Sequence, residues 1–140
     1  HEECRQNRQS GLAMRMMCLL GTAAVAIAVG TPAVAENVRL ESLVLRETVS
    51  HDGGERVRHI ERVDDFRSGE RVITILRWRA EKAAPFWVDS PVPGAVVVAA
   101  LPAGALARRD DSGRITHLRW RIEPNRSGQR GQVSYAGFVR

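Results

Sequence analysis

Cysteine is almost absent from this chain of 140 residues, and the two that it has, Cys4 and Cys18, lie near the N-terminus. Beyond residue 35 there is none, so a hydrophobic core and not disulfides must hold that part together. Lysine is equally scarce there, because Lys82 stands against 17 arginines. Acidic residues are interleaved with these arginines, and no long run of one sign occurs, so we expect no nucleic-acid partner.

Catalytic motifs are also missing. No G-x-S-x-G sequence occurs, and Ser68, Ser90 and Ser134 lie in turn or strand contexts that do not activate a nucleophile. The segment 64–70 is too poor in glycine and lysine for a phosphate-binding loop. We therefore assign no catalytic residue and no cofactor, and we expect a protein that is not an enzyme.

The N-terminal quarter has the three parts of a secretory signal. A basic start at Met14-Arg15 is followed by an apolar run of 15 residues (16–30) and a small-x-small exit at 33–35. A membrane span needs roughly 20 residues. We predict a helical signal peptide over 14–35, cleaved after Ala35, with an uncleaved anchor as the alternative. This predicts a periplasmic or secreted protein with no stable membrane span after cleavage, a folded domain over 36–140, and an upstream or disordered extension over 1–13.

After residue 36 the hydrophobic pattern has a period of two, and no amphipathic helix of ten residues appears. The predicted strands are 38–49, 55–63, 71–81, 84–90, 95–101, 114–123 and 131–140, with a loop at 102–113 that has room for a short strand. Asp52-Gly53 predicts a hairpin turn, and the slip in alternation at 43–45 suggests a bulge. About seven short strands predict an all-β, immunoglobulin-like β-sandwich.

The tetrapeptide Leu-Arg-Trp-Arg occurs twice, at 76–79 and 118–121. Because side chains alternate along a strand, each copy predicts leucine and tryptophan in the core and two arginines outside. A stacking platform made of both residue types is disfavoured, because tryptophan and arginine fall on opposite faces.

The order of turns and strands over 67–140 resembles a bacterial repeat family, domain of unknown function 11. The similarity lies in a Gly-containing turn leading into a long strand (68–79), a strand that ends in Asp and a proline pair (88–94), and two final strands around a Pro/Gly turn (116–135). This resemblance implies an immunoglobulin-like sandwich of exported and cell-surface proteins, without an established catalytic residue. The hairpin 37–66 resembles an N-terminal addition found in small single-domain proteobacterial members.

Metal-binding candidates are few. A zinc site needs three or four convergent ligands, and His51, Asp52 and His59 are the only candidates that come near each other if the hairpin forms. The acidic pairs 64–65 and 110–111 offer too few oxygens for calcium. We predict no metal site and treat these side chains as solvated surface.

The function predicted from these features is that of an exported, non-catalytic module with a structural or protein-interaction role in the cell envelope. The alternative is binding of an anionic glycan or lipid head group through the outward arginines Arg77, Arg79, Arg119 and Arg121. These four form one patch if the two repeated strands are neighbours in one sheet, and they are divided if the strands lie in different sheets. Cell-envelope proteins and anionic polymers are the predicted partners.

Overall fold

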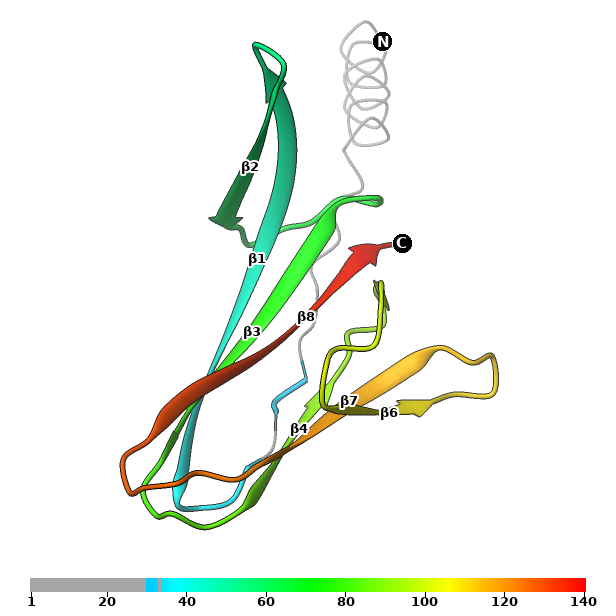
Figure 1. The fold of residues 1–140 in the computed structure, drawn as a ribbon. Coiled ribbons are helices and arrows are strands. Elements are labelled where there is room, and N and C mark those ends of the chain that lie inside the picture. The colour runs from blue at the N-terminus through cyan, green and yellow to red at the C-terminus, as the bar shows by residue number, and fades with distance from the viewer. Residues whose placement is uncertain (1–29, 33) are drawn as a thin grey trace, which may run out of the picture.

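A computed structural model describes residues 30–32 and 34–140 (Figure 1). The predicted extension 1–13 and most of the predicted signal peptide 14–35 lie outside the described residues. In the part of the chain that is described, no helix is long and apolar enough to cross a membrane.

Within residues 34–140, eight strands form two antiparallel sheets that pack face to face. They are β1 (Val38–Asp52), β2 (Glu55–Arg62), β3 (Arg71–Ala80), β4 (Phe86–Pro91), β5 (Val96–Val98), β6 (Ala105–Arg109), β7 (Ile115–Ile122) and β8 (Arg130–Val139). The large sheet has the order β2-β1-β3-β8-β5 and the small sheet β4-β7-β6. The predicted all-β sandwich is confirmed. The eighth strand, β6, lies within 102–113, where the sequence predicts a loop with room for a short strand.

The leucines and tryptophans of the repeated tetrapeptide lie in the core, as predicted. Leu76 and Leu118 are fully buried, and Trp78 and Trp120 are 8% and 3% exposed. Each tryptophan meets an aromatic ring of the opposite sheet. Trp78 contacts Phe86 edge-on with ring centroids 5.4 Å apart, and Trp120 stacks on Tyr135 at 6.5 Å. The two copies therefore join the two sheets, since burial of such large apolar groups is the main stabilising term.

The β1–β2 hairpin projects beyond the sandwich (Figure 1). Its predicted turn is confirmed, although the two residues with positive φ are Gly53 (57°) and Gly54 (88°). The last pair between β1 and β3 is Glu47–Arg71, so residues 48–52 pair with β2 alone. A free two-stranded ribbon is marginally stable in water, so its base needs support.

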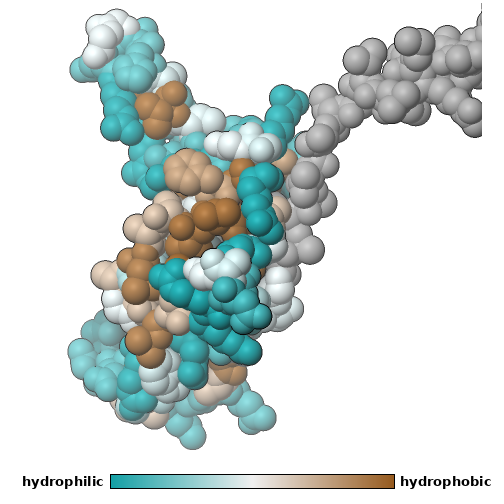
Figure 2. Space-filling view, turned by 90° about the vertical axis from the view of Figure 1, so that its right-hand side faces the viewer, coloured by the Kyte–Doolittle hydropathy of each residue, from teal (hydrophilic) through white to brown (hydrophobic). Residues whose placement is uncertain are grey.

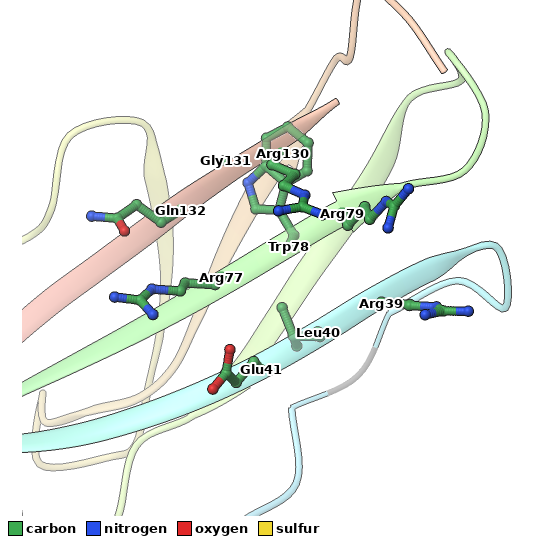
Figure 3. A pocket seen from close by; sticks show the side chains of 9 residues that line it. All are labelled: Arg39, Leu40, Glu41, Arg77, Trp78, Arg79, Arg130, Gly131 and Gln132. Atoms are coloured by element: carbon green, nitrogen blue, oxygen red, sulfur yellow. The ribbon is translucent and has the colours of Figure 1, made fainter. Parts of the chain in front are cut away.

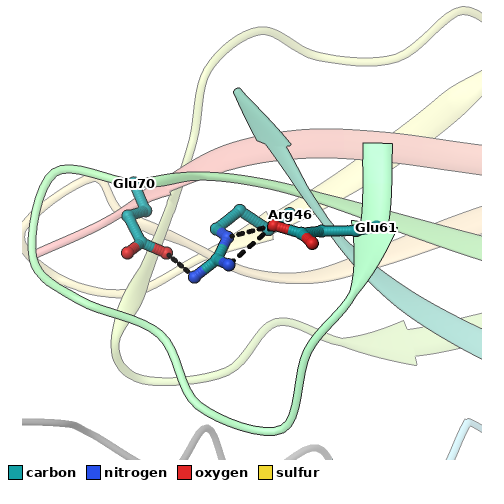
Figure 4. Close-up of polar contacts among 3 residues, drawn as sticks. All are labelled: Arg46, Glu61 and Glu70. Carbon is teal, nitrogen blue, oxygen red and sulfur yellow. Dashed lines mark hydrogen bonds and ion pairs between the residues drawn. The ribbon is translucent and has the colours of Figure 1, made fainter. Parts of the chain in front are cut away.

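Ion pairs on both faces anchor the base of the hairpin. On one face the Arg46 guanidinium lies between Glu61 and Glu70, at 2.7 and 3.4 Å (Figure 4). On the other face Glu47, whose side chain is 7% exposed, accepts from Arg58 at 3.0 Å and Arg71 at 3.2 Å. The Arg58 hydrogen bond is the largest influence lowering the pKa of Glu47 below its ordinary value. A network of several ion pairs contributes more to stability than an isolated surface ion pair does.

The bulge predicted at 43–45 is wrong. β1 keeps one continuous register with β3 from Val38 to Glu47. The alternation slips there because both faces of the strand carry apolar side chains: Val44 packs inside against the small cluster around Phe66, while Leu43 and Leu45 point to the outside.

Among the described residues, six large apolar side chains are more than 40% exposed: Val49, Ile60, Val97, Leu101, Leu106 and Phe138. In one view of the surface, hydrophobic area gathers in the middle of the molecule and hydrophilic area lies at its ends (Figure 2).

Candidate functional site

Three arginines face each other on neighbouring strands of the large sheet. The register pairs Arg39 of β1 with Arg79 of β3, and Arg79 with Arg130 of β8. We call these three residues the arginine row. Leu76 and Trp78 point into the sandwich, so the alternating arginines point away from it, onto what we call the outer face of the large sheet. The adjacent row toward the middle of the sheet is Glu41, Arg77 and Gln132.

The two rows line a shallow, open pocket of about 560 Å3 (Figure 3). Leu40, Trp78 and Gly131 complete its lining. The Trp78 side chain is 8% exposed and packs in the core beneath the pocket. A Cβ at Gly131 would collide with the Trp78 indole, which identifies the reason for glycine at this position. Beneath the arginine row, the Trp78 indole thus packs directly against the backbone of Gly131, which has no side chain.

The charges in this pocket are unbalanced. Arg39 is paired with Glu81 at 3.7 Å, with both side chains more than half exposed. Among the described residues, Arg77, Arg79 and Arg130 make no side-chain hydrogen bond or ion pair. Like charges directly opposite on neighbouring strands destabilise a sheet by about 0.2–1 kcal/mol per pair. The fold tolerates this repulsion at two successive pairs in one row.

Of the two arrangements considered for the four arginines of the repeated tetrapeptide, the fold has the divided one. β3 lies in the large sheet and β7 in the small sheet, so Arg77 and Arg79 are separated from Arg119 and Arg121. The first two are brought together with Arg39 and Arg130, which sequence reasoning missed. Neither of these lies in the repeated tetrapeptide, and only the strand register places them beside it.

Arg119 and Arg121 have partners in the small sheet. Their guanidinium carbons lie 4.6 and 5.6 Å from the centre of the Trp87 ring. Arg119 also pairs with Asp89 at 3.5 Å, and Arg121 with Glu123 at 3.3 Å. Stacking on an aromatic face and pairing with carboxylates both stabilise arginine locally. These two side chains are therefore less available to a ligand than the arginine row.

The histidine candidates are kept apart. His59 pairs with Thr48 and His51 with Arg56, so the two histidines occupy opposite faces of the hairpin. His59 Nε2 lies 3.3 Å from the Ser50 hydroxyl instead. In residues 30–32 and 34–140, no group of three or more His, Cys, Asp or Glu side chains is arranged to hold a metal ion.

The acidic pair at 110–111 shapes a turn. Asp110 Oδ1 accepts hydrogen bonds from the Ser112 hydroxyl at 2.7 Å and from the Ser112 and Arg114 backbone N–H groups at 3.0 Å each. The Ser112 hydroxyl bond is the largest cause of a lowered pKa for this carboxyl. Asp110 thus closes the connection between β6 and β7.

Comparison with family models, with curated proteins and with solved structures gave no match. The resemblance to the domain of unknown function 11 family stays a prediction from the residues that carry it.

Proposed function

We propose that this protein is an exported, non-catalytic β-sandwich module that binds anionic groups of a cell-envelope glycan or of lipid heads at the arginine row. The observation that carries the proposal is the alignment of Arg39, Arg79 and Arg130 on three adjacent strands, two of them without an acidic partner among the described residues. A bound anion relieves the repulsion between these guanidinium groups and adds charge-assisted hydrogen bonds.

The ligand class follows from the shape of the row. Adjacent strands lie about 4.8 Å apart, so the row spans about 10 Å. Planar guanidinium groups suit carboxylate and phosphate oxygens, and a polymer that carries several such groups engages more than one arginine at once.

Binding without catalysis fits the chemistry of the side chains. Arginine stays protonated at any physiological pH, so it is a poor general acid or base. The pocket is also open to solvent, which suits a polymer that lies across it. Export rests on the predicted signal peptide over 14–35, and the family resemblance supports the same location.

Protein interaction is a second candidate, favoured by the edge strand β2. This strand pairs only with β1, and seven of its eight residues are exposed. An edge strand of this kind can accept an added strand from a partner. A strict monomer at high concentration in light scattering would count against assembly through β2 by self-pairing.

Isothermal titration with soluble polyphosphate and with polygalacturonate tests the main proposal. Variants Arg79→Gln and Arg130→Gln are expected to lose affinity about tenfold each, since a charge-assisted hydrogen bond contributes about 1.5–3 kcal/mol. Arg119→Gln and Arg121→Gln are the matched controls in the small sheet, and they should bind like the unmodified protein. Equal losses in both pairs, or no binding at low salt, would contradict the proposal.

A further inference from the structure

The middle of the outer face of the large sheet is apolar. Beyond the row of Glu41, Arg77 and Gln132, the register places Leu43 beside Ile75, and then Leu45 beside Ile73 and Ala136. We call these five residues the apolar band. A sheet with one solvated face normally alternates apolar inside and polar outside. This sheet is apolar on both sides at its centre. Within the band Leu43 is buried, at 8% exposed, and the other four residues are half-buried.

Exposed apolar side chains continue the band on both sides. Ile60, Phe138 and Val97 lie in one cross-strand row with Glu47 and Arg71, and they are 48%, 43% and 43% exposed. Val49, at 41%, lies in the next row of the hairpin. Four of the six strongly exposed large apolar residues are thus on this face. Of the other two, Leu106 is on the small sheet and Leu101 is in a loop.

Arginines surround the apolar area. By register, the outer face carries the arginine row and Arg77 at one end, and four more arginines toward the hairpin: Arg56, Arg58, Arg62 and Arg71. The carboxylates on the same face are Glu41 and Glu47, and Glu81 pairs with Arg39 at its edge. Glu47 is already held between two arginines. Eight arginines against three glutamates leave this face with a net positive charge.

We infer that the outer face of the large sheet docks on an anionic lipid surface. The inference rests on the proposed function and names the source of the anionic groups. Phosphate groups of lipid heads would meet the arginines at both ends, while Ile60, Phe138, Val97 and Val49 enter the boundary between heads and acyl chains. A second copy of the chain is a poor occupant, because two such faces would bring the eight arginines of one copy against the eight of the other and repel each other. A hydrophilic glycan would leave the exposed apolar side chains in water.

Co-sedimentation with vesicles of phosphatidylglycerol and of phosphatidylcholine tests the inference. The protein should bind phosphatidylglycerol vesicles, with an affinity that falls as salt rises, and bind phosphatidylcholine vesicles at least tenfold more weakly. Phe138→Ser and Ile60→Ser should each weaken vesicle binding about fivefold, because each removes a large, partly exposed apolar group. Leu106→Ser is the matched control on the small sheet and should leave vesicle binding unchanged.

The arms of the experiment separate this inference from the proposed function. Phe138→Ser should bind soluble polyphosphate like the unmodified protein. Binding of polyphosphate without binding of vesicles overturns the docking inference and leaves the anion site standing. Vesicle binding that Phe138→Ser and Ile60→Ser leave unchanged also overturns the docking inference, because attraction between charges alone would then account for the binding. A dimer in analytical ultracentrifugation that Phe138→Ser abolishes would assign the face to a second copy of the chain and overturn the docking inference. If the unmodified protein binds neither polyphosphate nor vesicles, both proposals are wrong.

Discussion

Replacing the central arginine of the row should make the protein more stable. Arg79 stands directly between Arg39 and Arg130, so Arg79→Gln removes two like-charge contacts at once. Each contact costs about 0.2–1 kcal/mol, and the expected gain in the free energy of unfolding is therefore about 1 kcal/mol. For a domain of this size, that gain raises the Tm by about 5 °C.

Salt provides an independent check on the cause. Neighbouring strands lie about 5 Å apart, well inside the Debye length of roughly 10 Å at about 0.1 M salt. Added salt screens the repulsion, so it should stabilise the unmodified protein more than it stabilises Arg79→Gln. Urea unfolding followed by tryptophan fluorescence, at low and at high salt, measures both quantities.

The control for this experiment is Arg119→Gln. It removes an arginine that stacks on Trp87 and pairs with Asp89, so it should lower the stability by about 0.5–1 kcal/mol. A destabilised Arg79→Gln would refute the reasoning. So would a gain that is the same at low and high salt, because the three guanidinium groups would then not be in electrostatic contact.

The remaining predictions concern packing and acid stability. Gly131→Ala forces the Trp78 indole to move and should destabilise the protein by about 1–3 kcal/mol, with a changed near-UV circular dichroism spectrum; an unchanged spectrum would contradict the close packing. Leu118→Ala opens a cavity at a fully buried position and should cost about 2–5 kcal/mol in urea unfolding, and a loss under 1 kcal/mol would place Leu118 outside the core. The lowered pKa of Glu47 contributes stability that is present above its ordinary value of 4.5 and is lost as the pH falls through the lowered value. The urea midpoint should therefore fall as the pH is lowered below about 4.5, and it should fall less in Glu47→Gln, whereas equal falls would show that Glu47 is not held by Arg58.

The sequence predicted the faces of the strands well because alternation is a local property. Leu76, Trp78, Leu118 and Trp120 are buried as their period of two requires, and the arginines between them are exposed. The hairpin turn could be predicted for the same reason, since two successive glycines adopt positive φ without strain.

Only part of the candidate site could be predicted. Alternation places Arg77 and Arg79 on the outer face, but their neighbours depend on strand pairing, which is set by contacts between distant parts of the chain. Arg39 and Arg130 lie 91 positions apart and meet on either side of Arg79 only through the pairing of β1, β3 and β8. The same pairing separates the two copies of the repeated tetrapeptide, although their sequences are identical. The slip at 43–45 was detectable, but its cause is an outer face that is apolar at its centre and not a bulge.

Mapping a bound anion by nuclear magnetic resonance tests the central claim most directly. Soluble polyphosphate would be titrated into the isotopically labelled protein, and the backbone amide signals followed residue by residue. The account predicts the largest shifts at 39–41, 77–79 and 130–132, and none at 119–121 of the small sheet. Shifts centred on β7, or spread evenly over all exposed arginines, would contradict the claim that the arginine row is the binding site.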